Sequence, residues 1–182
     1  RGLVMSDRHV YVTTDDGLIR LDDNDGNGIA DARRTVTSSI IPAAGPRGAP
    51  VMDPNGRILV AGTLLPDHET LTVVAVHDDG RIEQLSGPGS NPGPLLVAQD
   101  GVYQVRRDPA NGSATIYRLP LDGAGAVIVS GATPIAAFPA GTDVNAVLVI
   151  ETTPWPEVPP HTLLAAVHDG GGGKIIRLAP HP

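Results

Sequence analysis

Cysteine is absent from the 182 residues of this chain, and aromatic residues make up only 3% of it. Without cysteine the protein has no disulfide bonds, no thiolate metal sites and no cysteine nucleophile. This absence is equally compatible with the cytosol, the periplasm and secretion. With so few aromatic rings, we expect neither base-stacking platforms for single-stranded nucleic acid nor broad sugar-stacking surfaces.

Clustered positive charge is missing as well. The chain has 13 Lys and Arg residues against 20 Asp and Glu residues, a formal net charge of −7, and its basic residues form no cluster. Because phosphate binding needs concentrated Lys and Arg, neither nucleic acid nor an anionic membrane surface is an expected partner.

Long apolar runs and helical periodicity are the remaining absences. No apolar run approaches the ~20 residues that a membrane-spanning helix needs, so we expect no membrane insertion. There is no sustained i, i+3, i+4, i+7 apolar stripe, and few stretches of ten residues lack Gly or Pro. The chain begins with Arg1 and carries no signal sequence, so we expect a mature product or a cut piece.

Short apolar runs separated by turn residues dominate the sequence instead. The 22 Gly and 18 Pro residues fall between these runs, which indicates many short elements joined by tight turns. The clearest runs alternate or are rich in β-branched residues, as strands do. They are His9–Thr13, Arg57–Ala61, Thr70–Val76, Val102–Arg106, Thr115–Leu119, Ala126–Val129, Ala146–Ile150 and Lys174–Leu178.

These runs group into four similar sets of four strands, at residues 2–37, 49–85, 94–130 and 134–178. The last strand of each set begins about 45 residues after the previous one, a spacing typical of propeller blades. The turns before these last strands also correspond, as in HDDGR (77–81), LDGAGA (121–126) and HDGGGGK (168–174).

We therefore predict an all-β fold in a single domain over 1–182, a β-propeller with four blades of four antiparallel strands. A fragment of a larger propeller is an open alternative. A β-sandwich has a similar strand density but does not require repeats of near-constant length.

The loop between the last two strands of the first set carries the strongest chemical signal, DNDGNGIAD. Its oxygen donors recur at loop positions 1, 3, 5 and 9, which are Asp23, Asp25, Asn27 and Asp31. Gly28 falls where the backbone turns sharply, and Ile29 falls where a main-chain carbonyl completes the ligand shell. Calcium prefers such a flexible array of hard oxygen donors, so we predict a structural Ca²⁺ site.

This loop resembles the DxDxDG loops of EF-hands, dockerins and FG-GAP-type propeller repeats. It is most similar to the DTDGDGxAD insertions of propellers related to soluble quinoprotein sugar and sorbosone dehydrogenases, where the loop also follows a strand. The resemblance implies a propeller fold and calcium binding. It also implies oxidation with pyrroloquinoline quinone through a His base and cationic cofactor contacts, which we cannot match to residues of this chain.

One position departs from the EF-hand pattern. Loop position 12, which holds a bidentate Glu in EF-hands, is Arg34 here. The flanking runs are strand-like, so no helix–loop–helix is expected. We expect weaker binding or a further donor, such as Asp22 or a water.

No motif for catalysis stands out. His77 and His168 fall at corresponding ends of third strands in two sets, which we interpret as repeated turn chemistry rather than a paired site. The pairs 15–16 and 78–79 are both Asp-Asp and lie in turns, where Asp is favoured for backbone hydrogen bonding. Trp155, within the Pro-rich stretch 152–160, is expected either as an exposed contact residue or as a cap on the propeller rim.

From these features we expect an extracytoplasmic (periplasmic or secreted) propeller that is stabilised by one calcium ion and acts as a binding or structural module rather than an enzyme. The second hypothesis is a fragment or relative of a quinone-dependent sugar or aldehyde dehydrogenase. The third is a subunit of a larger assembly, formed by self-association through edge strands or the Trp155 loop. The sequence does not specify the protein or small-molecule ligand.

Overall fold

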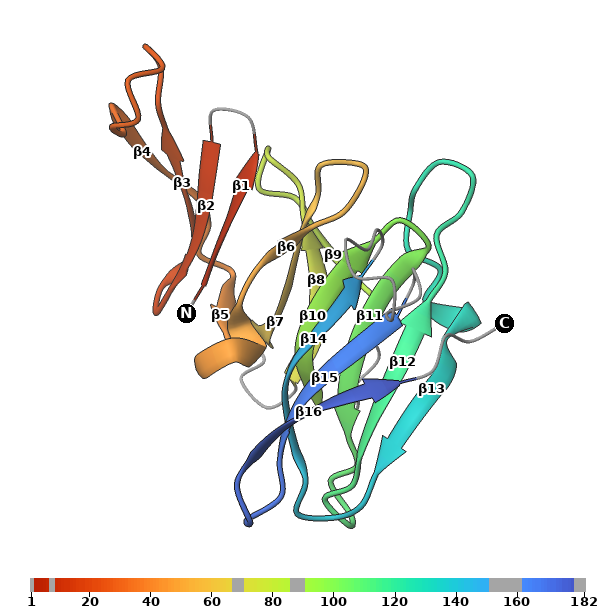
Figure 1. Cartoon of the computed structure of the whole chain (residues 1–182). Helices are drawn as coiled ribbons and strands as arrows, with labels where there is room; N and C mark the ends of the chain where they lie inside the picture. Colours follow the sequence, from red (N-terminus) through yellow and green to blue (C-terminus); the bar gives the residue numbers. More distant parts are fainter. Residues whose placement is uncertain (1, 7–8, 67–70, 86–90, 151–161, 179–182) are drawn as a thin grey trace.

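The computed structural model describes residues 2–6, 9–66, 71–85, 91–150 and 162–178, which form four antiparallel β-sheets (Figure 1). Sheet 1 contains β1 (Leu3–Ser6), β2 (His9–Thr14), β3 (Gly17–Asp22) and β4 (Ala32–Thr37). Sheet 2 contains β5 (Ile40–Pro42), β6 (Val51–Met52), β7 (Ile58–Leu64), β8 (Leu71–Val76) and β9 (Ile82–Gln84).

Sheet 3 contains β10 (Pro92–Ala98), β11 (Gly101–Arg107), β12 (Ala114–Leu119) and β13 (Thr133–Phe138). Sheet 4 contains β14 (Asp143–Ile150), β15 (Thr162–His168) and β16 (Gly173–Leu178). The helical segments of the described chain are two short 3₁₀ turns, η1 (Gly45–Gly48) and η2 (Val129–Gly131). Neither these nor any other described segment forms a helix long and apolar enough to cross a membrane.

The four sheets are arranged as the blades of a β-propeller, and this confirms the predicted fold class. Strands that follow one another in the chain also pair side by side, so that the order in sheet 1 is β1-β2-β3-β4 and the order in sheet 3 is β10-β11-β12-β13. Successive sheets touch where their early strands lie, since β10 contacts both β14 and β6, and β6 contacts β1. The architecture is therefore a series of blades in chain order.

The central strands of sheets 2 and 3 are apolar on both faces because another sheet covers each face. In β7, Ile58 and Val60 face sheet 1 whereas Leu59 and Ala61 face sheet 3, and all four are at most 2% exposed. Successive side chains of a strand point to opposite faces, so a continuous apolar run places one half in each junction.

Three apolar clusters hold the blades together, one for each pair of successive sheets. The first joins sheets 1 and 2 and includes Leu18 and Ile40; the second joins sheets 2 and 3 and includes Leu59 and Val102. The third joins sheets 3 and 4 through 11 buried residues, among them Ile116. In the described part of the chain, no such cluster joins sheet 4 to sheet 1.

The third and fourth strand sets differ from the predicted bounds of 94–130 and 134–178. Residues 134–138 were assigned to the fourth set, but as part of β13 they pair with β12 and form the outer strand of sheet 3. The run 126–129 was predicted as a strand, yet it contributes one isolated bridge, Val127 with Leu121, and the start of η2. Sheet 4 consequently has three strands in the described chain.

This shift overturns the predicted equivalence of His77 and His168. His77 follows β8, which leads into the outer strand of sheet 2, whereas His168 ends β15, the second strand of sheet 4. The β15–β16 turn lies at the bottom of the view in Figure 1, whereas the β3–β4, β8–β9 and β12–β13 turns lie at the top. The two His residues therefore belong to opposite ends of the blades.

Candidate metal centre

The acidic loop is the turn between β3 and β4, and the two strands close it at its base. Asp22 and Ala32 are paired across the strands, and the N–H of Asp31 donates to the carbonyl of Asp22 at 2.8 Å. Gly26 and Gly28 have φ of +76° and +83°, a left-handed conformation that glycine adopts without strain. The two glycines curl the loop back toward its own base.

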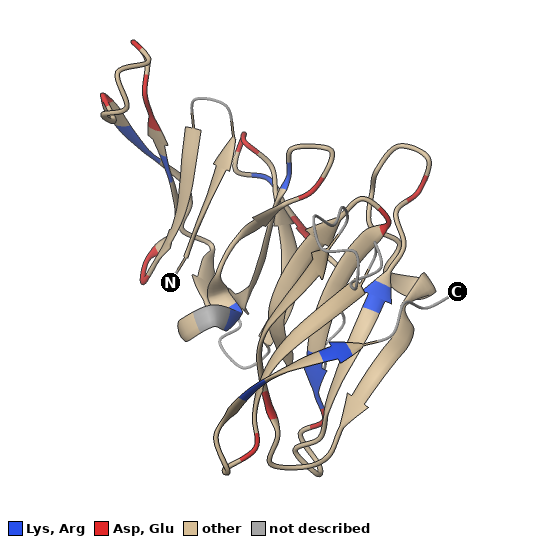
Figure 2. Cartoon of the chain, viewed as in Figure 1, with Lys and Arg blue, Asp and Glu red and all other residues tan. Residues whose placement is uncertain are grey.

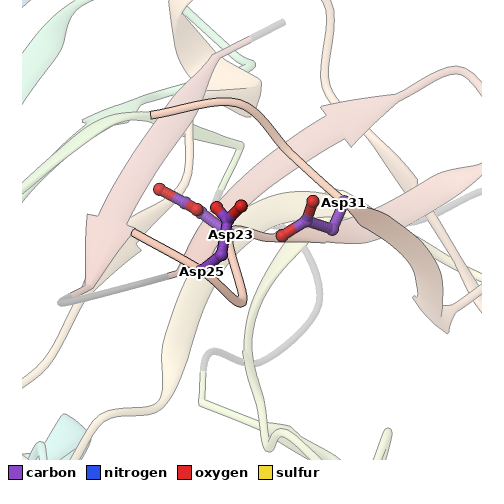
Figure 3. Close-up of side chains that lie close together, drawn as sticks. All are labelled: Asp23, Asp25 and Asp31. Atoms are coloured by element: carbon purple, nitrogen blue, oxygen red, sulfur yellow. The ribbon is translucent and has the colours of Figure 1, made fainter. Parts of the chain in front are cut away.

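The curled loop brings three carboxylates together. Oxygens of Asp23, Asp25 and Asp31 all lie within 4.8 Å of one another, and the side chains converge in Figure 3. Since Ca²⁺ binds oxygen at about 2.3–2.6 Å, two ligands on opposite sides of one ion lie about 5 Å apart. The three carboxylates, all predicted as ligands, are thus spaced so that one calcium ion fits between them.

Backbone donors hold the first of these carboxylates in place. Asp23 accepts hydrogen bonds from the N–H groups of Gly26 (2.8 Å), Asn27 (3.1 Å) and Gly28 (2.8 Å). The Gly28 N–H contributes most to lowering the pKa of the Asp23 carboxyl below its ordinary value, and the other two donors add to it. Asp23 is therefore ionised and oriented before any cation arrives.

The remaining loop residues are also organised by local hydrogen bonds. The N–H of Asn24 donates to Asp31 Oδ2 at 2.7 Å, which draws the end of the loop toward its start. Asn27 donates from Nδ2 to Asp25 Oδ2 at 2.8 Å, and its Oδ1 accepts from the N–H of Ile29 at 2.7 Å. The roles of Asn27 Oδ1 and the Ile29 carbonyl as ligands stay predictions.

Asp22 was one of the alternatives for a further donor, and its contacts argue against that role. Its buried carboxylate does not belong to the group of three loop carboxylates but lies 2.6 Å from Arg20 Nε and 2.7 Å from His9 Nδ1. Burial raises the pKa of Asp22, but the Arg20 guanidinium outweighs this and lowers it. A carboxylate held by a guanidinium and an imidazole in this way is not available as a ligand.

Arg34, the residue at loop position 12, has a role that sequence reasoning missed. Its Nη2 binds Asp78 Oδ1 at 2.8 Å, and Asp78 lies in the β8–β9 turn of sheet 2. Asp78 also accepts from Arg20 Nη1 at 2.7 Å and from the Tyr11 hydroxyl at 3.0 Å. The only signal in the sequence was an Asp-Asp pair in a turn, which gives no partner 44 residues away.

The other candidates form no catalytic group among the described residues. The His77 ring contacts Arg81 of its own turn at 3.0 Å, and the His168 ring accepts the N–H of Gly170 at 3.5 Å. Asp79 accepts the N–H of Arg81, as expected for a turn residue. Trp155 lies outside the described residues.

A pocket of about 620 Å³ opens where sheets 2, 3 and 4 meet, lined by η1 and the starts of β10 and β14. Its charged side chains are Arg47, Arg107 and Asp143, and Arg107 is paired with Asp143. The pocket and the carboxylate loop belong to different blades, so they are separate features.

Comparison with protein-family models and with curated proteins finds no match for this chain. The function of the protein therefore has to be inferred from its own residues.

Proposed function

We propose that this chain is a calcium-stabilised β-propeller module that serves a binding or structural role. The observation that carries the proposal is the convergence of Asp23, Asp25 and Asp31 within 4.8 Å on a loop with the ligand spacing of known calcium loops. Three carboxylates so close together repel one another, and a divalent cation offsets that repulsion.

The position of the loop supports a structural role for the ion. The loop joins β3 to β4, the outer edge of sheet 1, and is largely exposed (Figure 1). The adjoining residues Arg20 and Arg34 connect the same two strands to sheet 2 through Asp78. An ion in the loop would stiffen the end of a strand pair that already holds blade 1 to blade 2.

The quinone-dependent alternative is less well supported by the described residues. It calls for a His base beside cationic cofactor contacts, and the 620 Å³ pocket is lined by two Arg residues without a His. His77 and His168 lie at opposite ends of the blades. A binding or structural role therefore accounts for more of what the molecule shows.

Calcium titration with thermal unfolding tests the proposal. Saturating Ca²⁺ is expected to raise the melting temperature of the chain by about 5–10 °C, because a ligand at 100-fold its Kd adds about 2.7 kcal/mol of stability. The variant Asp25→Asn is expected to lose most of this shift. Its melting temperature without calcium should be no lower than that of the unsubstituted chain.

Asp16→Asn is the matched control, since Asp16 is an exposed carboxylate in the turn between β2 and β3 of sheet 1. That variant should keep the full calcium shift. If the unsubstituted chain showed no shift, or if Asp25→Asn showed the same one, the proposal would be wrong.

A further inference from the structure

Among the residues that the structure describes, nothing covers the apolar outer face of either end sheet of the series. In sheet 1 this outer face is built by two cross-strand rows, Leu3–Val12–Ile19 and Met5–Val10–Leu21. It is the face opposite Tyr11 and Leu18, which pack on sheet 2. Leu3 is 61% exposed and Met5 is 69% exposed. We name these six residues the sheet 1 outer face.

Sheet 4 has a matching surface at the other end of the series. Its rows are Ala146–Ala166–Ile175 and Leu148–Leu164, on the face opposite the buried Ala165 and Val167. Leu148 is 54% exposed and Ile175 is 77% exposed. We name these five residues the sheet 4 outer face.

Neither the sheet 1 outer face nor the sheet 4 outer face contains a charged side chain. Strands β1, β2 and β15 carry no Lys, Arg, Asp or Glu, and they are tan along their length in Figure 2. The charged side chains of these rows are Arg33 and Arg177, which stand on the outermost strands, β4 and β16. An apolar centre with charge at its rim is the composition of a protein interface rather than of a solvated surface.

We propose that the sheet 4 outer face of one chain packs against the sheet 1 outer face of a second copy, so that two chains form a closed, head-to-tail dimer. The occupant is a second copy because the chain already builds this kind of contact three times. At each internal junction a sheet packs one face against the next sheet in the series. That next sheet uses its other face for the junction that follows. The two uncovered faces are the two halves of one further junction of this kind.

Reciprocal packing removes both exposed faces at once. Sheet 4 of each copy meets sheet 1 of the other, so a pair of chains has no uncovered blade left and contains eight blades. Eight is within the range of known propellers. The contact is heterologous, and such contacts end in a finite particle only when the rotation closes on itself.

The mass of the chain in solution, over a wide range of protein concentration, tests the proposal. The unsubstituted chain is expected to have twice the mass of one chain. Met5→Glu and Ile175→Glu each place a carboxylate in one of the two outer faces, and each variant alone is expected to be monomeric. Both side chains are mostly exposed, so the circular dichroism of the variants should match that of the unsubstituted chain.

Mixing the two variants distinguishes head-to-tail packing from other dimers. A Met5→Glu chain keeps an intact sheet 4 outer face and an Ile175→Glu chain keeps an intact sheet 1 outer face, so the mixture should regain a dimer with one intact junction. Ala124→Glu, in the exposed turn between β12 and β13, adds the same charge away from both faces and should stay dimeric.

Three results would overturn the proposal. They are a monomeric unsubstituted chain, open-ended polymers, and a dimer that only one of the two substitutions disrupts, as expected if like faces paired with each other. None of the three loop carboxylates belongs to either outer face, so the mass measurement and the calcium titration test the two proposals separately.

Discussion

Asp78 joins the first two blades through three side chains that lie in one row across sheet 1. Tyr11, Arg20 and Arg34 are neighbours on β2, β3 and β4, and all three donate to the Asp78 carboxylate. Partial burial raises the pKa of Asp78, but these hydrogen bonds outweigh the burial and lower the pKa below its ordinary value. The ionised carboxylate is thus favoured by folding.

Asp78→Asn is expected to lower the free energy of unfolding at neutral pH. It should also make that free energy less sensitive to a fall in pH. A carboxyl whose pKa is lowered by folding contributes stability fully above its unfolded-state pKa of about 4, and loses it as the pH falls through the folded-state pKa. The free energy of unfolding of the two proteins should therefore differ at pH 7 and converge below about pH 4. Urea unfolding over this pH range measures the difference.

Asp79→Asn is the control, because Asp79 sits in the same turn and its carboxylate accepts the N–H of Arg81. This bond is also available to Asn, so the variant should follow the pH dependence of the unsubstituted chain. Equal effects of the two substitutions would mean that the contacts of Asp78 with sheet 1 do not stabilise the junction.

A second residue-scale contact lies inside sheet 2, where Arg57 is buried. Asp53 Oδ2 binds its Nη2 at 2.7 Å, and the half-exposed Glu83 binds its Nη1 at 2.8 Å. Asp53→Asn keeps the side-chain oxygen that accepts the N–H groups of Asn55 and Arg57 but removes the charge. We expect a loss of about 3 kcal/mol in the free energy of unfolding, because a buried cation is left without its buried partner.

Glu83→Gln provides the comparison on the same guanidinium. Glu83 is 49% exposed, and exposed ion pairs contribute about 0–1 kcal/mol. Chemical denaturation of both variants gives the two free energies directly. A cost for Glu83→Gln equal to that for Asp53→Asn would contradict the importance that we assign to burial.

At the scale of elements, the turns were the most predictable part of this molecule. DPNGR, HDDGR and DGAGA form the same four-residue hairpin turn, closed by paired backbone bonds such as His77 N to Arg81 O at 2.9 Å. The fourth residue is Gly56, Gly80 or Gly125, with φ between +73° and +86°. Asp, Asn and Gly are favoured in such turns for local reasons, so the sequence alone identifies them.

Strand pairing was less predictable, because it depends on burial as well as on local preference. The run 126–129 is apolar like a strand, but Val127 and Val129 reach the cluster between sheets 2 and 3 from a loop. The true outer strand, β13, begins with Thr133 and Pro134 and is half exposed, so its pattern is weak. An apolar run indicates burial, and burial does not require a strand.

The same distinction explains what could be predicted of the metal loop. Asp23, Asp25 and Asp31 are close in sequence, so their convergence follows from a turn and two glycines. The His9 partner of Asp22 lies on the neighbouring strand and the Asp78 partner of Arg34 lies in another blade, and spacing along the chain carries no information about either contact. The sequence therefore predicted the group of carboxylates that are close together in the chain, but not the contacts between strands or between sheets.

At the scale of the whole molecule, each blade depends on its neighbours in the series. The three apolar clusters share no residue, and each joins only two successive sheets. In proteins built this way, stability is close to a sum of the terms for each repeat and each junction. Damage at one end of the series should therefore leave the other end folded.

Hydrogen exchange in Leu18→Ala and Ile116→Ala tests this directly. Both side chains are fully buried, Leu18 in the junction of sheets 1 and 2 and Ile116 in the junction of sheets 3 and 4. Each substitution should cost about 2–5 kcal/mol through the cavity it leaves. Leu18→Ala is expected to speed exchange of the amides of β2 and β3 while β12 and β15 keep their protection, and Ile116→Ala should do the reverse. If either variant lost protection equally in all four sheets, the blades would form one cooperative unit, and the three junctions could not be treated as separate contributions to stability.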